Sequence, residues 1–351
     1  MLASSQLVAI PITDPNPTYT YFMLCKKKGE EHYKYKTAKD HNKLELIPFD
    51  VLLVIRLSKR WDLGVFKDAR LKESKEKVAL FFPKENISTN SEEILKLNRL
   101  SHENIIKFYG ITYDRENQTE MIVLQLPAEN LCEYLTKNSK QIEQTDKLNI
   151  ANDVTSGLEF LHKNNIVHGD LHSRNIFIDN NKRALITNPK IFTVINGHSS
   201  MDLLRNKNKI CYIDTRLLKN SHKQPDKKSD IYSLAVVMWR IFSDKEPFSN
   251  YENNLISLIH EILLQNIREE PTEDTPEKYI AIYTKCWSSD LKNRLTTSDI
   301  LSELSKGSWQ AGEASFFLAS QIWARLLPCQ LANHPKWVAS REVAVRRQPS
   351  Y

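Results

Sequence analysis

The sequence predicts an α+β protein with two lobes, a small strand-rich lobe followed by a larger helical one. Residues 50–126 hold short runs of β-branched and aromatic residues, the pattern of strands. Later residues place apolar side chains three and four positions apart, the pattern of amphipathic helices. With 351 residues, 41% of them apolar, the chain is long enough to bury a core in each lobe.

Composition excludes several other classes of protein. The net charge of +6 is spread over 49 basic and 43 acidic residues, so a mixed-charge surface is expected and nucleic-acid binding is not. No segment is apolar and uncharged for long enough to predict a membrane span. Met1–Thr13 lacks the basic start of a secretory signal. Five separated cysteines without a C-x-x-C pair argue against disulfides and zinc, and favour a reducing, cytoplasmic location.

Residues 1–48 form an N-terminal region of distinct composition. Two alternating stretches, Thr18–Tyr21 and Tyr33–Lys36, lie on either side of Gly29. Such alternation around a glycine-bearing turn is typical of a β-hairpin, but a flexible extension explains the same residues equally well. Both interpretations remain open from the sequence.

Residues 49–126 are expected to form the small lobe. Strands are predicted at Val51–Ile55, Lys77–Phe82 and Met121–Leu126, and Ser91–Leu100 has helical spacing. About five strands with one helix would fit this length.

Residues 127–306 are expected to form the helical lobe. Asp146–His162 is predicted to be an amphipathic helix. Ile231–Phe242 is apolar nearly all round, with Arg240 as its one charge, which is typical of a helix inside a core. Two lobes leave a cleft between them, a common place for a ligand.

The composition changes again in residues 307–351. Residues 308–351 contain one lysine but four arginines, together with three of the six tryptophans. Ser315–Leu327 is predicted to be an amphipathic helix that docks on the body of the protein or on a partner, and Pro328 ends it.

The sharpest motif is Val167–Ile178, which reads VHGDLHSRNIFI. It resembles the catalytic loop of protein kinases, H-R-D-L-x-x-x-N, in the form found in tyrosine-kinase-like families. The spacing of five between Asp170 and Asn175 is that of the family.

The residues around this loop extend the resemblance over about residues 50–306. Glu93–Ile106 resembles the family's regulatory helix and the turn after it, and Phe108–Gly110 resembles the next strand. Ser229–Trp239 resembles the buried helix of the large lobe, and Cys286–Arg294 resembles the closing segment. The resemblance implies a bilobal kinase domain at 49–306, divided into lobes 49–126 and 127–306.

The same resemblance implies ATP and Mg²⁺ as cofactors and protein substrates or partners. Asp170 takes the place of the catalytic carboxylate, while Asn175 and Asn188 take the places of the metal ligands. The adenine-binding places hold five residues: Val65, Ala79, Gln125, Pro127 and Phe177.

Several nucleotide-binding motifs depart from the family pattern. The three glycine positions of the phosphate-covering loop read Ser58, Arg60 and Leu63. The V-A-I-K lysine is replaced by Phe81, and D-F-G reads Asn188-Pro189-Lys190. Without the lysine and the aspartate, the phosphates and the metal ion lose two of their usual charged partners.

Two further departures concern regulation. Gly169 replaces the arginine before the catalytic aspartate, so no arginine stands there to bind a phosphorylated segment. The glutamate of A-P-E is replaced by Arg216, which is expected to face Arg294, so this segment should be anchored differently. His168 is expected in the core, and His172 either in solvent or against a phosphate.

Three classes of function follow from these residues. The first is a pseudokinase, a signalling or scaffold protein that binds partners with little phosphotransfer. The second is an active or residually active protein kinase, for Ser/Thr or Tyr, with an altered nucleotide site. The third is a kinase-derived chain with an incidental tail and no selected role.

Overall fold

The computed structural model describes residues 20–27, 30–37, 46–47, 52–61, 64–72, 74–82, 100–114, 119–138, 141–187, 207–220, 222–243, 245–251, 254–306 and 309. At residues 20–27, 30–37, 46, 53–61, 64–65 and 207–208 it describes the backbone alone. The chain divides into two compact units, residues 1–205 and 206–351, and each is described by itself.

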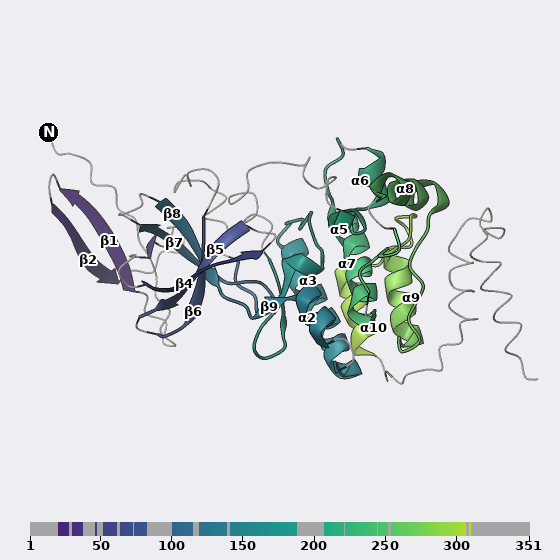
Figure 1. Ribbon diagram of the computed structural model, residues 1–351, viewed down its shortest axis with the longest axis horizontal. Helices are drawn as coiled ribbons and strands as arrows, with labels where there is room; N and C mark the ends of the chain where they lie inside the picture. Colours follow the sequence, from purple (N-terminus) through teal and green to yellow (C-terminus); the bar gives the residue numbers. More distant parts are fainter. Residues whose placement is uncertain are drawn as a thin grey trace, which may run out of the picture. The chain divides into compact units, whose positions relative to one another are not determined.

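The first unit begins with two paired strands (Figure 1). β1 (Thr20–Lys27) and β2 (Glu30–Thr37) are antiparallel, in register from Thr20 opposite Thr37 to Lys27 opposite Glu30. Of the two interpretations of these residues, the hairpin is the one that the structure forms.

A six-stranded sheet forms the small lobe, in the order β3-β7-β8-β6-β5-β4. Neighbouring strands are antiparallel except β3, which runs parallel to β7. Its strands are β3 (Leu46–Ile47), β4 (Leu52–Trp61), β5 (Gly64–Leu71), β6 (Lys77–Phe81), β7 (Phe108–Asp114) and β8 (Thr119–Gln125). The three predicted strands are confirmed as parts of β4, β6 and β8, while the helix predicted at Ser91–Leu100 lies outside the described residues except for Leu100.

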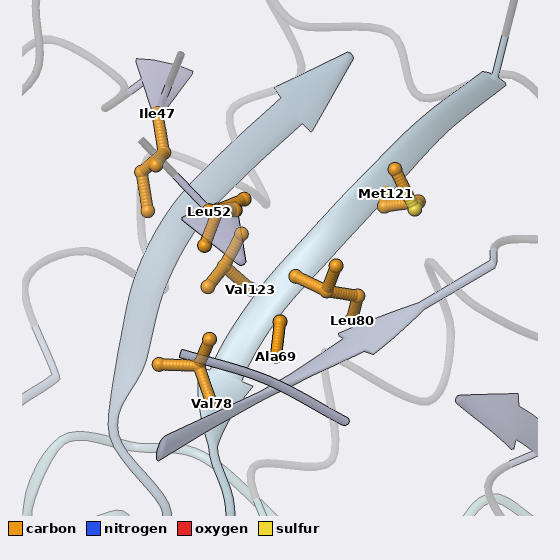
Figure 2. Packing of buried hydrophobic residues seen from close by; sticks show 7 residues of the cluster. All are labelled: Ile47, Leu52, Ala69, Val78, Leu80, Met121 and Val123. Atoms are coloured by element: carbon orange, nitrogen blue, oxygen red, sulfur yellow. The ribbon is translucent and has the colours of Figure 1, made fainter. Parts of the chain in front are cut away.

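Both faces of this sheet are buried. One face carries a cluster of aliphatic side chains, shown in Figure 2: Ile47, Leu52, Ala69, Val78, Leu80, Met121 and Val123. Because side chains alternate along a strand, the residues between them face the other way: Phe66, Ala79, Phe81, Ile122 and Leu124, none more than 1% exposed. This second face carries Ala79 and Phe81, which the kinase resemblance places at an adenine contact and at the phosphate-binding lysine.

The remaining described residues of the first unit include two helices and a small sheet. β9 (Glu129–Asn130), β10 (Ile176–Ile178) and β11 (Ala184–Ile186) form the sheet. The helices are α2 (Leu131–Asn138) and α3 (Gln144–Lys163). The helix predicted at Asp146–His162 is confirmed as α3.

A close contact fixes α3 against the segment that enters β7. A Cβ added at Gly157 of α3 would lie 2.6 Å from the backbone oxygen of Asn104. That oxygen accepts a hydrogen bond from the Ile186 amide of β11 at 2.9 Å, and the Asn104 side chain donates to the Ala184 oxygen at 3.1 Å. Glycine is required here because the backbone approaches so closely.

The second unit is helical (Figure 1). Its elements are α5 (Lys207–Ile210), α6 (Thr215–Lys219), α7 (Lys227–Phe242), α8 (Leu255–His260), the π-helical turn η4 (Glu261–Gln265), α9 (Glu277–Cys286) and α10 (Thr297–Ser305). In the described part of the chain, no helix is both long and apolar enough to cross a membrane.

Helix α7 forms the centre of this unit. Asp226 and Ser229 cap its start reciprocally, and every residue from Ile231 to Phe242 except Ser233 is buried. Arg240, at 1% exposure, donates to the backbone oxygen of Ser243 at 2.5 Å. The predicted core helix is therefore confirmed, and Nε of Arg240 lies 3.5 Å from a carboxylate oxygen of Glu246.

Beyond Lys306, which caps α10, the described residues include only Trp309, which lies edge-on against Tyr279 of α9. The helix predicted at Ser315–Leu327 lies outside the described residues.

Candidate functional site

The loop after α3 brings Asp170 and Asn175 into direct contact. Asn175 ends the short 3-10 helix η2 (Ser173–Asn175), and its side-chain amide donates to the backbone oxygen of Asp170 at 2.7 Å. The same amide lies 3.2 Å from Oδ2 of Asp170. Asp170 keeps 23% of its side chain exposed, whereas Asn175 is fully buried. The carboxylate is thus held in one orientation and still reached by solvent.

The backbone of this loop requires glycine at one position. Gly169 has φ 75°, in the left-handed region where a side chain is strained. Nδ1 of the preceding His168, which is 3% exposed, accepts a hydrogen bond from the Asp170 amide at 3.3 Å. His168 is therefore a core histidine, as its position in the motif predicts.

His172 is buried and turned toward Asp170. Its side chain is 2% exposed, and Nε2 lies 3.5 Å from Oδ1 of Asp170. Nδ1 accepts from the Arg174 amide at 3.3 Å, so the imidazole also caps the 3-10 helix. The expectation of a solvated histidine is wrong, because the fold of the loop turns the ring inward. Asp170 is accordingly contacted through both oxygens, by His172 and Asn175.

The side-chain oxygen of Asn175 is not used by the hydrogen bonds described in this loop. Oδ1 of Asn175 is buried and accepts no hydrogen bond from any described residue. A buried polar atom without a partner is costly, and an amide oxygen is a ligand that Mg²⁺ accepts. Asn175 and the neighbouring Asp170 therefore fit a divalent cation.

The small-lobe sheet presents an aromatic pair where the kinase resemblance places a lysine. Phe81 of β6 is opposite Phe66 of β5, and the two rings stack with centroids 5.2 Å apart and an interplanar angle of 29°. Both are fully buried. Phe81 shares its face of the sheet with Ala79, so the position that normally grips a phosphate is filled by hydrocarbon.

The strand register places a carboxylate beside Ala79, one of the residues expected near the adenine. Asp68, not Val65, lies opposite Ala79, while Val65 is opposite Arg60 of β4. Oδ1 of Asp68 is buried and accepts no hydrogen bond from the described residues. A carboxylate therefore lies next to Ala79. At Val65 the structure describes the backbone alone.

The connection from β8 to β9 offers few backbone donors. The Gln125 amide donates to the Lys107 oxygen at 2.9 Å, and the Ala128 amide donates to the Ile178 oxygen at 3.1 Å. Pro127, between them, has no N–H. Of the four residues from Gln125 to Ala128, only Leu126 has an amide hydrogen that neither bond uses. Phe177, the last predicted adenine contact, is fully buried in β10.

The predicted phosphate loop is only partly described. Ser58 and Arg60 lie within β4, and the pairing of β4 with β5 continues to Trp61 opposite Gly64. Leu63 and the predicted metal ligand Asn188 lie outside the described residues. The structure thus brings Asp170 and Asn175 together, and places Ala79 beside Phe81 rather than beside a lysine.

Sequence reasoning missed an ion-pair network in the second unit. Asp214, fully buried, accepts from Nη1 of Arg294 at 2.5 Å and from Nη2 at 3.1 Å. Arg216 donates to the same carboxylate through Nε at 2.9 Å, and to Asp226 through Nη1 at 2.9 Å. Asp214 bonds both Arg216 and Arg294, so this segment is anchored differently from the family pattern, as the sequence predicts.

The charges of this network favour ionised carboxylates. Burial raises the pKa of Asp214, but the hydrogen bonds from Arg294 and Arg216 outweigh it and hold that pKa below its usual value. The hydrogen bond from Arg216 lowers the pKa of Asp226 to about 2. The sequence held one signal for this network, Asp214 itself. Aspartate is favoured as an N-cap, and Asp214 lies directly before α6.

A strand-rich lobe, a helical lobe and an Asp-Asn loop after a long helix define the class of protein kinases. The sequence profile of the protein tyrosine and serine/threonine kinase family matches residues 64–304. The chain belongs to this family.

Its relatives include kinases from distant organisms. Receptor-interacting serine/threonine-protein kinase 1 of Homo sapiens is 27% identical over 219 residues, 58% of this chain and 32% of the human protein. Dual specificity protein kinase zakA of Dictyostelium discoideum is 29% identical over 227 residues, 60% of this chain and 29% of that protein. Serine/threonine-protein kinase VIK of Arabidopsis thaliana is 28% identical over 225 residues, 61% of this chain and 49% of that protein. The chain spans less than half the length of each.

Proposed function

We propose that this chain is a pseudokinase, a kinase-fold signalling or scaffold protein that binds protein partners in the cytoplasm and has impaired ATP binding and phosphotransfer. The observation that carries the proposal is Phe81, buried and stacked on Phe66 at the place of the phosphate-gripping lysine. The free, buried cysteines Cys132, Cys211 and Cys286 are compatible with a reducing compartment. The kinase domain is proposed to occupy residues 49–306, between an N-terminal extension and a C-terminal tail.

The residues fit the two parts of an Mg²⁺–ATP complex unequally. Asp170 and the unpartnered Oδ1 of Asn175 suit a cation. Hydrocarbon at Phe81, a carboxylate at Asp68 and the missing amide hydrogen of Pro127 do not suit a nucleotide. The Asp170–Asn175 part of the metal site is therefore retained, whereas the D-F-G aspartate and the nucleotide side are not.

The magnitude of the losses supports impaired catalysis. Removing one preorganised charge-stabilising group typically costs ~3–4 kcal/mol of transition-state stabilisation, about 10²–10³ in rate. The lysine and the D-F-G aspartate, replaced by Phe81 and Asn188, are two such groups. Because the two groups act as a unit, losing both costs less transition-state stabilisation than the ~6–8 kcal/mol that simple addition gives. Asp170 by itself does not compensate for a loss of this size.

A nucleotide titration of the full chain tests the proposal. A ligand at a hundred times its Kd stabilises the folded state by ~2.7 kcal/mol, which thermal melting detects readily. The proposal expects no rise in melting temperature with ATP, with or without Mg²⁺. Saturable stabilisation together with phosphate transfer that Asp170→Ala abolishes would overturn it.

The second candidate is a kinase with an altered nucleotide site. The specific observation in its favour is the intact pairing of Asp170 with Asn175, including the free oxygen suited to a cation. The same titration separates the two candidates, because only this one expects Mg²⁺-dependent ATP binding. Its substrates would be proteins, through Ser/Thr or Tyr residues.

A further inference from the structure

The helical unit exposes two large aliphatic side chains on one segment. Ile256 is 82% exposed and Leu264 is 68% exposed, and His260 between them is also exposed. Leu258 and Ile262, on the opposite side, are at most 1% exposed and hold the segment in the core. Ile256, His260 and Leu264 are called the α8 ridge below.

The backbone brings the ends of the α8 ridge into line. Residues Leu255–His260 are α-helical, but Glu261–Gln265 form a π-helical turn that ends at left-handed Asn266, φ 50°. A π-turn contains more residues than an α-turn, so Leu264 returns closer to the line of Ile256 than a continuous α-helix would allow. Apolar surface exposed along one edge in this way gains free energy when an apolar occupant covers it.

The chain after α10 starts from the same unit. Trp309 lies against Tyr279, with ring centroids 6.4 Å apart and an interplanar angle of 77°. Tyr279 is fully buried and donates to the Met238 oxygen at 3.0 Å. Residues 310–351 therefore follow a residue that is anchored on α9, beyond the end of the family match at 304.

Helix α9 and Arg268 connect this anchor to the α8 ridge within the same unit. Tyr279 is near the start of α9, and Nε of Arg268 donates at 3.2 Å to the backbone oxygen of Trp287, which follows its end. The ten residues of α9 span ~15 Å, and Leu264 is four positions before Arg268. Residues 310–314 extend to ~17 Å and a helix over Ser315–Leu327 adds ~20 Å, so the C-terminal part of that helix is within reach of the ridge.

Charges along this path are complementary. Residues 268–277 carry five acidic residues against one arginine: Glu269, Glu270, Glu273, Asp274, Glu277 and Arg268. Residues 308–351 carry five basic and two acidic residues: Arg325, Lys336, Arg341, Arg346, Arg347, Glu313 and Glu342. The acidic segment connects the α8 ridge to the Trp309 anchor, and attracts the basic tail to that surface.

We propose that the α8 ridge is the docking site of this chain's own segment Ser315–Leu327. That segment has apolar residues spaced for one helical face: Phe316, Ile322, Trp323, Leu326 and Leu327. Docking covers Ile256 and Leu264, and a protein partner that uses the ridge must first displace the tail. The contact is independent of nucleotide binding.

Hydrogen–deuterium exchange of the full chain, read by mass spectrometry, tests this docking reciprocally. A ridge variant, Ile256→Ser with Leu264→Ser, is expected to raise exchange in 315–327 about tenfold. A tail variant, Trp323→Ser with Leu327→Ser, is expected to raise exchange in 255–265 by a similar factor. Tyr113→Ser removes another exposed hydrophobic side chain, 45% exposed, and should change neither region.

Three outcomes would overturn the proposal. One is exchange in 315–327 that the ridge variant leaves unchanged. Another is protection of the ridge that depends on protein concentration and accompanies a dimeric mass, since a second copy would then be the occupant. The third is hydrogen exchange in 255–265 that the tail variant leaves unchanged. This measurement can be made even if the ridge variant fails to fold.

Discussion

Replacing Asp214 by asparagine should destabilise the helical unit strongly. The carboxylate is fully buried and bonds Arg294, whose side chain is also fully buried, and Arg216, whose side chain is 17% exposed. Asparagine keeps the size of the side chain but removes its charge, leaving the buried guanidinium without a counter-ion. Breaking a buried pair in this way typically costs ~3–5 kcal/mol.

The surroundings of Arg294 place the expected cost at the lower end of that range. Its guanidinium also donates to the Ser288 oxygen at 2.7 Å and the Lys228 oxygen at 2.9 Å, and lies 5.2 Å from the Tyr232 ring centroid. These contacts remain in the variant, so a loss of ~3 kcal/mol is expected. At ~2–4 °C per kcal/mol, the melting temperature should fall by roughly 6–12 °C.

Asp226→Asn is the matched control, read in the same calorimetric and urea-unfolding experiments. Asp226 bonds the same Arg216, but its side chain is 46% exposed, and asparagine caps a helix as well as aspartate does. An exposed pair contributes ~0–1 kcal/mol, so this variant should melt within about 4 °C of wild type. If Asp214→Asn costs no more than Asp226→Asn, the role given to the buried pair is wrong.

Three other substitutions or conditions have expected outcomes. Gly157→Ala should lower the urea-unfolding free energy by ~1–3 kcal/mol, because the added methyl overlaps the Asn104 oxygen; an unchanged midpoint would contradict that contact. Phe81→Ala should cost ~3–5 kcal/mol in the same assay, since the ring is fully buried; a loss below ~1 kcal/mol would show that the ring is not packed. Asp214 and Asp226 both have lowered pKa values, so their stabilisation is complete above the unfolded value near 3.8 and is lost in acid, for Asp226 as pH falls toward its folded pKa of about 2. Melting temperatures from pH 5 to 2 should therefore fall more steeply in wild type than in Asp226→Asn. Parallel curves would refute the contribution of ionised Asp226 to stability.

Local sequence was sufficient for the loop that carries Asp170 and Asn175. The two residues are five positions apart and meet within one short loop, so the spacing alone predicts their contact. Helix α3 was predictable for a similar reason, because a regular apolar period places one face of a helix in the core. The class of fold followed from the order of such local patterns.

Other features depend on residues that are distant in the sequence. Asp214 and Arg294 are 80 positions apart, and only the packing of the helical unit shows that this aspartate pairs with the buried arginine. The position of Asp68 opposite Ala79 depends on strand register, which composition does not specify. His172 turns inward because the loop folds back on itself.

By itself, the sequence determined the family of this protein and the residue types missing from its nucleotide site, because both depend on the identity of residues at fixed spacings. Only the tertiary structure decided what replaces them: a stacked aromatic pair at Phe81 and a carboxylate at Asp68. It also decided that Ile256 and Leu264 are left outside the core. The physical reason is that burial and pairing are set by contacts between separate elements, which no local pattern contains.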